Sequence, residues 1–371
     1  MLLIKPEVMK RLREAQDISV VQDMLISAFT LELATLPTYF TGAFSVKAGA
    51  NQEAWALVQS VALEEMLHLT LACNLLISIG GNPEILKTGL GLKFPTQLPM
   101  NVDEGLSVSL QALTKEHIYQ VFMGIERPDT RTPLPGETAL HRLTTLKIEK
   151  GYNSIGDFYE AILLKLAEFQ VAGDDPFAHP REERQVNILK WFPPTNRKCG
   201  NGKVTNLASA KAVIHTIVSQ GEGVTVEKTP IDPYGGLEGS FAHFFKFGEI
   251  FYGNRLVENA LAPSGWSYSG APVALDQQGI HNFLPNAALS DYAPGSGAYV
   301  AGADFYNVYK RLLTSLDHVF NGAPDQLNAA LGIMYELKLV AQKVVQYPAN
   351  PSDPDGLVAA PPFMLTHCEP A

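Results

Sequence analysis

The stretch from Leu63 to Gly81 places ionisable side chains inside a strongly apolar helix. It reads LEEMLHLTLACNLLISIGG, so that two glutamates and a histidine interrupt an otherwise apolar run. A buried carboxylate without a partner is so costly that it is either protonated or paired with a positive charge. The chain must therefore fold so that it supplies such a partner, and the remaining sequence indicates which one.

The whole chain is predicted to be mainly α-helical. Its apolar residues recur at helical spacing, no clear run of alternating strand pattern is present, and Gly- and Pro-rich segments separate the helices. Pro37 is expected to kink the first long helix, and Ser154 begins a later one with capping-box chemistry. The expected helices cover about 17–46, 51–79, 107–125, 155–171, 206–220, 239–256, 303–320 and 324–346.

Composition excludes several classes of protein. With 371 residues, 46% of them hydrophobic and 18% charged, the chain can bury a sizeable core. A formal net charge of −10 argues against nucleic acid as a partner. The three cysteines have no close spacing, so neither a disulfide framework nor a Cys-rich zinc site is indicated, and Cys73 is expected in a reduced core.

The sequence also predicts a cytoplasmic protein without membrane contact. Glu32 interrupts the first long apolar run, and the ionisable residues of 63–81 interrupt the second, so neither offers the roughly 20 uncharged apolar residues that cross a bilayer. The N-terminus lacks the basic-then-apolar order of a secretory signal.

Helical wheels direct three carboxylates inward. Glu32 lies in the middle of an apolar stripe on helix 17–46, and Glu65 shares the apolar sector of helix 51–79 with His68. On helix 155–171, Glu160 falls between leucines and an alanine. Three helices are thus expected to aim a carboxylate at one core.

The spacing of Glu65 and His68 indicates what these acids do. Glu-x-x-His places a carboxylate oxygen and an imidazole nitrogen side by side, which is the ligand pattern of dinuclear carboxylate sites in helix bundles. Each residue alone has an ordinary explanation: a chance Glu-x-x-His, a Glu32 bonded to a tyrosine or the backbone, a surface Glu160. Their conjunction favours two metal ions, which neutralise several carboxylates at once.

Two later residues are candidates for the remaining ligands. Glu222 lies between glycines just past a helix end, and His243 lies in the first turn of helix 239–256 among phenylalanines. The alternatives are a solvated loop glutamate and an aromatic-packed core histidine. The weaker candidates are Glu64, His117, Glu126, His215 and Glu249.

The segments ISAFTLELATLPTYFTGAFSV and EAWALVQSVALEEMLHLTLACNLLISIGGNP resemble the ferritin-like domain of the iminophenyl-pyruvate (indole-pyruvate imine) dimer synthase family. The later QGEG and SFAHFFKF are similar to the Gln-Gly-Glu-Gly and Ser-His-aromatic segments of that family, although here two residues separate the serine from the histidine. The resemblance implies a non-haem di-iron site held by Glu32, Glu65, His68, Glu160, Glu222 and His243. The chain is far shorter than the pigment synthases, so their dimerising activity is not transferred to it.

The expected fold is mainly α: a ferritin-like four-helix-bundle core with long inserted loops and additional C-terminal helices. Residues 1–260 are predicted to form the metal-binding bundle, with inserts at about 82–150 and 172–204. Residues 261–371 are predicted to form a C-terminal extension whose two helices pack on the bundle. Connections as long as these inserts usually carry function or cover a site.

Three functions follow as hypotheses. The first is a dinuclear non-haem iron oxidase or oxygenase that uses O2 to oxidise a small aromatic or amino-acid-derived molecule, as in secondary metabolism. The second is iron handling without an organic substrate, such as a ferroxidase or a peroxide-removing protein. The third is a metal-free helical binding module. Two iron ions are the expected cofactors, although Mn or Fe/Mn also suit these ligands, and a small homo-oligomer is expected.

Overall fold

The computed structural model describes residues 3–98, 106–128, 134–136, 153–192, 199–221 and 240–367. It is mainly helical, which confirms the predicted fold class. The α-helices are α1 (Pro6–Arg13), α2 (Ile18–Phe44), α3 (Gln52–Ser78), α4 (Ile85–Gly91), α5 (Lys115–His117), α6 (Met123–Ile125), α8 (Ile155–Ala172), α9 (Leu207–Gln220), α10 (His243–Tyr252), α11 (Gly297–Phe320) and α12 (Leu327–Val344). The short helices are η2 (Ile118–Phe122), η3 (Glu182–Arg184), η4 (Ile188–Lys190), η5 (Gln277–Gly279), η6 (Leu289–Asp291) and η7 (Pro324–Gln326).

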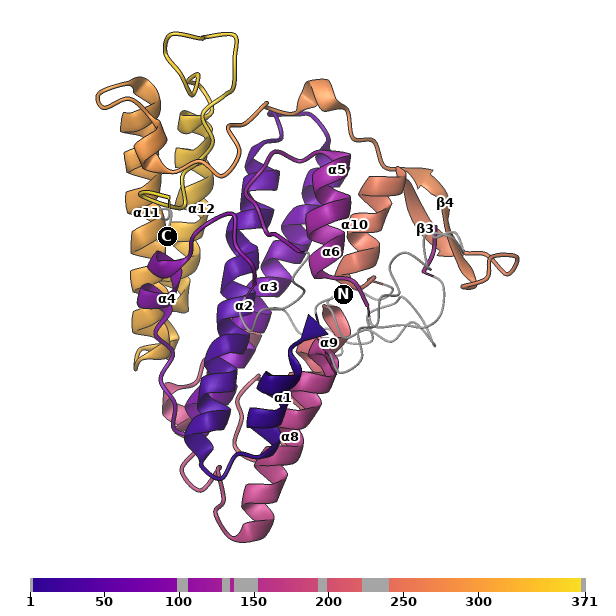
Figure 1. Ribbon diagram of the computed structural model, residues 1–371, viewed down its shortest axis with the longest axis vertical. Coiled ribbons are helices and arrows are strands. Elements are labelled where there is room, and N and C mark those ends of the chain that lie inside the picture. Colours follow the sequence, from indigo (N-terminus) through magenta and orange to yellow (C-terminus); the bar gives the residue numbers. More distant parts are fainter. Residues whose placement is uncertain are drawn as a thin grey trace.

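The centre of the molecule is a bundle of α2, α3, α8 and α9 (Figure 1). Helices α2 and α3 pack along each other, α8 packs against α2 and α9, and α9 packs against α3. Buried apolar side chains cover most of α2 and α3. Because these two helices are apolar over most of their circumference, they need neighbours on several sides, and a four-helix bundle supplies them.

Side-chain caps mark where α2, α8 and α9 begin. The Asp17 side chain accepts a hydrogen bond from Ser19 N at 2.7 Å at the start of α2. Reciprocal capping boxes begin α8 at Ser154 and α9 at Asn206. These caps satisfy backbone donors that a helix leaves unpaired at its N-terminus. The predicted helices 17–46, 51–79, 155–171 and 206–220 agree with the structure to within a few residues.

Other elements differ from the predictions. The helix predicted at 239–256 ends at Tyr252, because Gly253 adopts a left-handed backbone conformation with φ of +82°. The chain then forms an antiparallel hairpin of β3 (Asn254–Glu258) and β4 (Trp266–Pro272). A second small sheet pairs β1 (Leu3–Ile4) with β2 (Asn153–Ser154), and no alternating pattern in the sequence indicated either sheet.

Helices α11 and α12 pack on each other at one side of the bundle, and α10 and the β3–β4 hairpin lie at the other (Figure 1). Helix α11 contacts α4, and α12 contacts α2. Helix α11 begins at Gly297, earlier than predicted, because the Ser296 side chain accepts a hydrogen bond from Tyr299 N at 3.1 Å. The predicted domain boundary near residue 260 remains a prediction.

By length and composition alone, α2 and α3 could cross a membrane, since their most apolar windows have a mean hydropathy of 1.3. The bundle buries 56% of that window in α2 and 83% of it in α3. The core helices of a helical bundle share these properties, so the absence of membrane contact and the cytoplasmic location remain predictions.

Candidate metal centre

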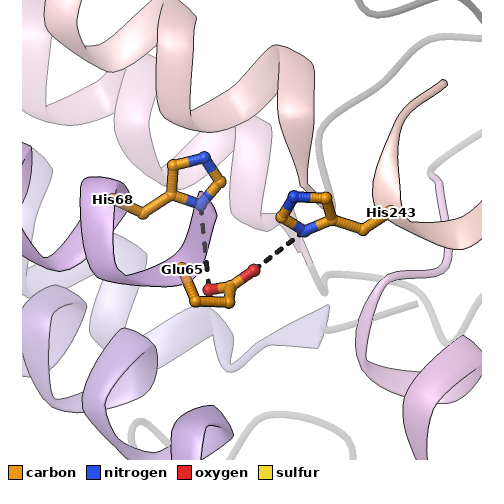
Figure 2. Close-up of side chains that lie close together, drawn as sticks. All are labelled: Glu65, His68 and His243. Atoms are coloured by element: carbon orange, nitrogen blue, oxygen red, sulfur yellow. Dashed lines mark ion pairs between the residues drawn. The ribbon is translucent and has the colours of Figure 1, made fainter. Parts of the chain in front are cut away.

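The carboxylate of Glu65 lies between two imidazoles (Figure 2). His68, one turn along α3, places Nδ1 3.7 Å from Glu65 Oε2, and His243, the first residue of α10, places Nδ1 2.8 Å from Glu65 Oε1. All three residues are buried, and the imidazole centroids are 5.3 Å apart. Because its two oxygens face different histidines, Glu65 is arranged as a carboxylate that can bridge two ions.

Two further carboxylates flank this group, one beside each histidine. Glu32 of α2 places Oε2 3.9 Å from His68 Nδ1. Glu126, directly after α6, places Oε2 3.3 Å from His243 Nδ1. Glu126 therefore reaches the core from the first insert, and three buried glutamates converge on two histidines.

Tyrosines hold the outer oxygens of the two flanking carboxylates. The Tyr159 hydroxyl, from α8, donates to Glu32 Oε1 at 3.2 Å, and the Tyr39 hydroxyl, from α2, donates to Glu126 Oε1 at 2.5 Å. These bonds leave Oε2 of each flanking carboxylate facing a histidine. Each carboxylate thus has one oxygen fixed and one directed at the centre of the site.

The outer edges of the imidazoles are also bonded. His68 Nε2 lies 2.9 Å from Gln220 Oε1, and His243 Nε2 lies 2.9 Å from Glu64 Oε2. Since both partners are hydrogen-bond acceptors, Nε2 of each ring carries a proton, and Nδ1 is the nitrogen that faces the carboxylates. In this orientation each imidazole could bind a metal ion through Nδ1.

The electrostatics of the site favour a cation. Burial opposes ionisation of Glu65, but the adjacent imidazoles of His243 and His68 outweigh it and hold the pKa of Glu65 well below its usual value. Burial and the negative charge of Glu65 raise the pKa of Glu126. Burial opposes protonation of His243, yet Glu126 and the other nearby carboxylates raise its pKa well above normal. The buried glutamates around His243 therefore favour a positive charge between them.

The residues present fit a metal. His243 Nδ1 and Glu126 Oε2 are buried and have no hydrogen-bond partner, which is the state of a ligand atom that awaits an ion. The cavity that Glu32, Glu65, His68 and Glu126 line is about 10 Å³. Carboxylate oxygens and imidazole nitrogens suit iron and manganese. Glu65, His68 and His243 offer ligand atoms that all lie within 4.8 Å of one another.

The inward orientation expected for Glu160 is wrong. Its side chain is exposed on α8, and the neighbouring Tyr159 is the residue that reaches the site. The helical wheel gave the wrong direction because it counted Leu164 as part of a buried apolar sector around Glu160. Leu164 is itself 58% exposed. Lys165, on the same helix, is buried and donates to Arg13 O at 2.6 Å.

Glu222 lies outside the described residues, so its role stays a prediction. The structure adds Glu126, which the sequence offered only as a weaker candidate. Its position four residues after Phe122 places it on the buried face of the η2–α6 segment, and that spacing is the signal that could have found it.

The other weaker candidates have separate roles. Glu64 contacts His243 from behind, as described above. Glu249 accepts hydrogen bonds from Arg255 Nη1 at 2.5 Å and Leu256 N at 3.0 Å, and so ties α10 to β3. His117 is buried with an edge-to-face contact to Phe122, and His215 is half-buried on α9.

A four-helix bundle whose buried centre holds a Glu-x-x-His and further inward carboxylates defines the ferritin-like class of helical protein. Residues 25–252 match the family described as Ferritin-like, and the chain belongs to that family. A search of curated proteins found no match. A solved ferritin-like protein from Caulobacter vibrioides is 20% identical, with a TM-score of 0.54 over 89% of this chain and 96% of that chain, which supports the fold alone. The resemblance to the dimer synthases remains a prediction.

Proposed function

We propose that this protein is a dinuclear non-haem iron oxidase or oxygenase that uses O2 to oxidise a small molecule. The observation that carries the proposal is the placement of Glu65 between His68 and His243, with Glu32 beside one histidine and Glu126 beside the other. Each ion position would have one imidazole, one flanking carboxylate and one oxygen of Glu65. Iron bound there would supply the redox chemistry that activation of O2 needs.

The surrounding residues give the site its order and dryness. Tyr39 and Tyr159 hold the flanking carboxylates, and Gln220 and Glu64 hold the imidazoles. Tyr39, Phe122 and Phe247 form a buried three-ring cluster with centroids 4.9 to 5.2 Å apart. Such an apolar wall excludes water and so strengthens every charge interaction inside the site.

The substrate class rests on the family resemblance. The cavity at the described ligands has room for ions or a water molecule, since a water needs about 10–15 Å³ of such space. We propose an aromatic or amino-acid-derived substrate that approaches this centre, in a small cytoplasmic homo-oligomer.

Metal stoichiometry tests the site. After anaerobic loading with Fe(II) and desalting, the wild type is expected to retain about two irons per chain by elemental analysis. Glu65→Ala is expected to retain none, because both ion positions share that carboxylate. Glu160→Ala removes an exposed glutamate of the same bundle and should bind as the wild type does. If the wild type retained no metal after loading and desalting, the result would contradict the proposal and favour the helical binding module.

Oxygen consumption separates an oxidase from an iron-handling protein. The oxidase predicts O2 uptake that depends on a particular organic compound, and a small assembly by gel filtration. Fast turnover of Fe(II) alone, by a large cage that mineralises iron, would favour the ferroxidase instead.

A further inference from the structure

The two histidines of the metal centre differ in what lies behind them. His68 Nε2 faces a neutral amide oxygen, that of Gln220, at 2.9 Å. His243 Nε2 faces a carboxylate oxygen, that of Glu64, also at 2.9 Å. A hydrogen bond to an ionised acceptor is roughly twice as strong as one to a neutral acceptor. It also raises the basicity of the imidazole, and hence the strength of its other nitrogen as a ligand.

In other respects the two halves of the site correspond. Each histidine directs Nδ1 at a different oxygen of Glu65. Each flanking carboxylate, Glu32 or Glu126, accepts a hydrogen bond from a tyrosine through Oε1. The tyrosine bond to Glu126 is the shorter, which slightly weakens that carboxylate as a ligand, but the acceptor behind the imidazole changes from a neutral amide to an ionised carboxylate.

A buried lysine fixes this carboxylate in place. Lys246 lies one turn after His243 on α10, and its Nζ donates to Glu64 Oε2 at 2.5 Å. Glu64 and Glu65 are consecutive on α3, so one helix presents a carboxylate to each edge of the His243 ring. Nε2 of His243 is therefore held by an ionised carboxylate before any metal binds, whereas the contact behind His68 is with a neutral side chain.

We propose that the two metal positions are unequal, that the His243 position is filled first, and that Glu64 is the positioning residue responsible for the difference. This inference rests on the dinuclear site proposed above. It predicts a protein that holds one ion firmly and takes up the second at a higher concentration.

Titration of the full-length protein with Co(II) under anaerobic conditions tests the order of filling. Visible absorption and calorimetry should resolve two binding constants that differ at least tenfold. Glu64→Gln keeps the size of the side chain and removes its charge, so we expect the tighter constant to weaken by about 10- to 100-fold. The weaker constant should change little.

Two further variants guard against an effect on folding. The double variant Glu64→Gln/Lys246→Met removes the ion pair as a unit and leaves no buried lysine unpaired, so it should lose the tight constant just as Glu64→Gln does. Glu168→Gln is the matched control, because Glu168 also pairs with a buried lysine, Lys165, at 2.5 Å on a different helix. It should leave both constants unchanged.

The outcomes distinguish this inference from the proposed function. Two ions bound with equal constants, or separated constants that Glu64→Gln leaves in place, would overturn the inference while the dinuclear site stands. A wild type that binds neither Co(II) nor Fe(II) would overturn the proposed function itself, and the inference with it.

Discussion

At the scale of single residues, two buried glutamates show that burial alone does not mark a metal ligand. Glu126 and Glu249 are exposed by only 1% and 2%. Both carboxylate oxygens of Glu249 accept hydrogen bonds, one from Arg255 and one from a backbone amide. In contrast, Oε2 of Glu126 has no hydrogen-bond partner. The unsatisfied oxygen is what distinguishes a candidate ligand from a structural acid.

This contrast predicts opposite effects of the same substitution. Glu126→Gln should reduce retained iron from about two to about one per chain, because the His243 position loses a charged ligand, and should change stability little. Glu249→Gln should keep the metal content and lower the free energy of unfolding by about 1–2 kcal/mol, because a buried bond to a charged group is weakened. Elemental analysis and urea denaturation of both variants decide it, and metal loss in Glu249→Gln would contradict the assignment.

His117 predicts a pH dependence of stability. Its two ring nitrogens are buried without hydrogen-bond partners, and burial lowers its pKa to about 4. The unfolded chain takes up this proton at about pH 6.5 and the folded protein does not. Stability from this residue is therefore complete above pH 6.5 and falls by about 3 kcal/mol as the pH drops to 4.

Comparison with His117→Leu isolates this effect. Urea denaturation at pH 7 and at pH 4 should show that the wild type loses about 3 kcal/mol more than the variant, since both share all other acid-sensitive groups. Equal losses in the two proteins would rule out a neutral, buried His117.

At the scale of elements, Gly42 sets how closely the first insert approaches the bundle. A Cβ at this position of α2 would lie 2.8 Å from Phe122 Cζ and 3.3 Å from Leu113 Cδ1. Phe122 is fully buried on η2, the segment that leads to Glu126. The absence of a side chain at Gly42 thus allows the insert to deliver its carboxylate to the site.

Alanine substitutions at two helical glycines should therefore have opposite signs. Gly42→Ala is expected to lower the free energy of unfolding by about 1–3 kcal/mol through overpacking. Gly332→Ala, on α12 with no heavy atom within 4 Å of the added Cβ, should raise it by about 0.5–1 kcal/mol. Thermal and chemical denaturation measure both, and a stabilising Gly42→Ala would show that the insert is not tightly packed there.

The bundle helices could be predicted because their signals are local. Asp17 and Ser154 mark helix starts through bonds to nearby backbone, and α3 ends near Gly80, whose φ is +88°. Helix α10 was predicted too long because apolar residues continue past Tyr252. Gly253, with its positive φ, is the residue at which the backbone changes from helix to strand. A helical wheel reads composition, and it does not detect a change of backbone conformation.

At the scale of the whole molecule, four of the five residues that meet in the candidate site were proposed from the sequence, and Glu126 was only a weaker candidate. Glu32, Glu65 and His68 lie on long helices whose apolar stripes define the inward direction. Glu126 comes from an insert whose path depends on tertiary packing, so its spacing from Phe122 indicates a buried face but does not show that this face meets the metal centre. The prediction for Glu160 was wrong because the exposed Leu164 gives α8 a second apolar sector. A helical wheel does not distinguish this exposed apolar sector from the buried one.

The delivery of Glu126 and His243 from outside the four bundle helices has a mechanical consequence. A metal pair at this site would cross-link α2, α3, the end of α6 and α10, much as disulfides tie distant loops to a core. The loops between Glu65, Glu126 and His243 contain roughly 60 and roughly 120 residues, and closing loops of that length costs the unfolded chain appreciable entropy. Metal content would thus govern how firmly residues 106–128 and α10 are attached to the bundle, more than it governs the bundle itself.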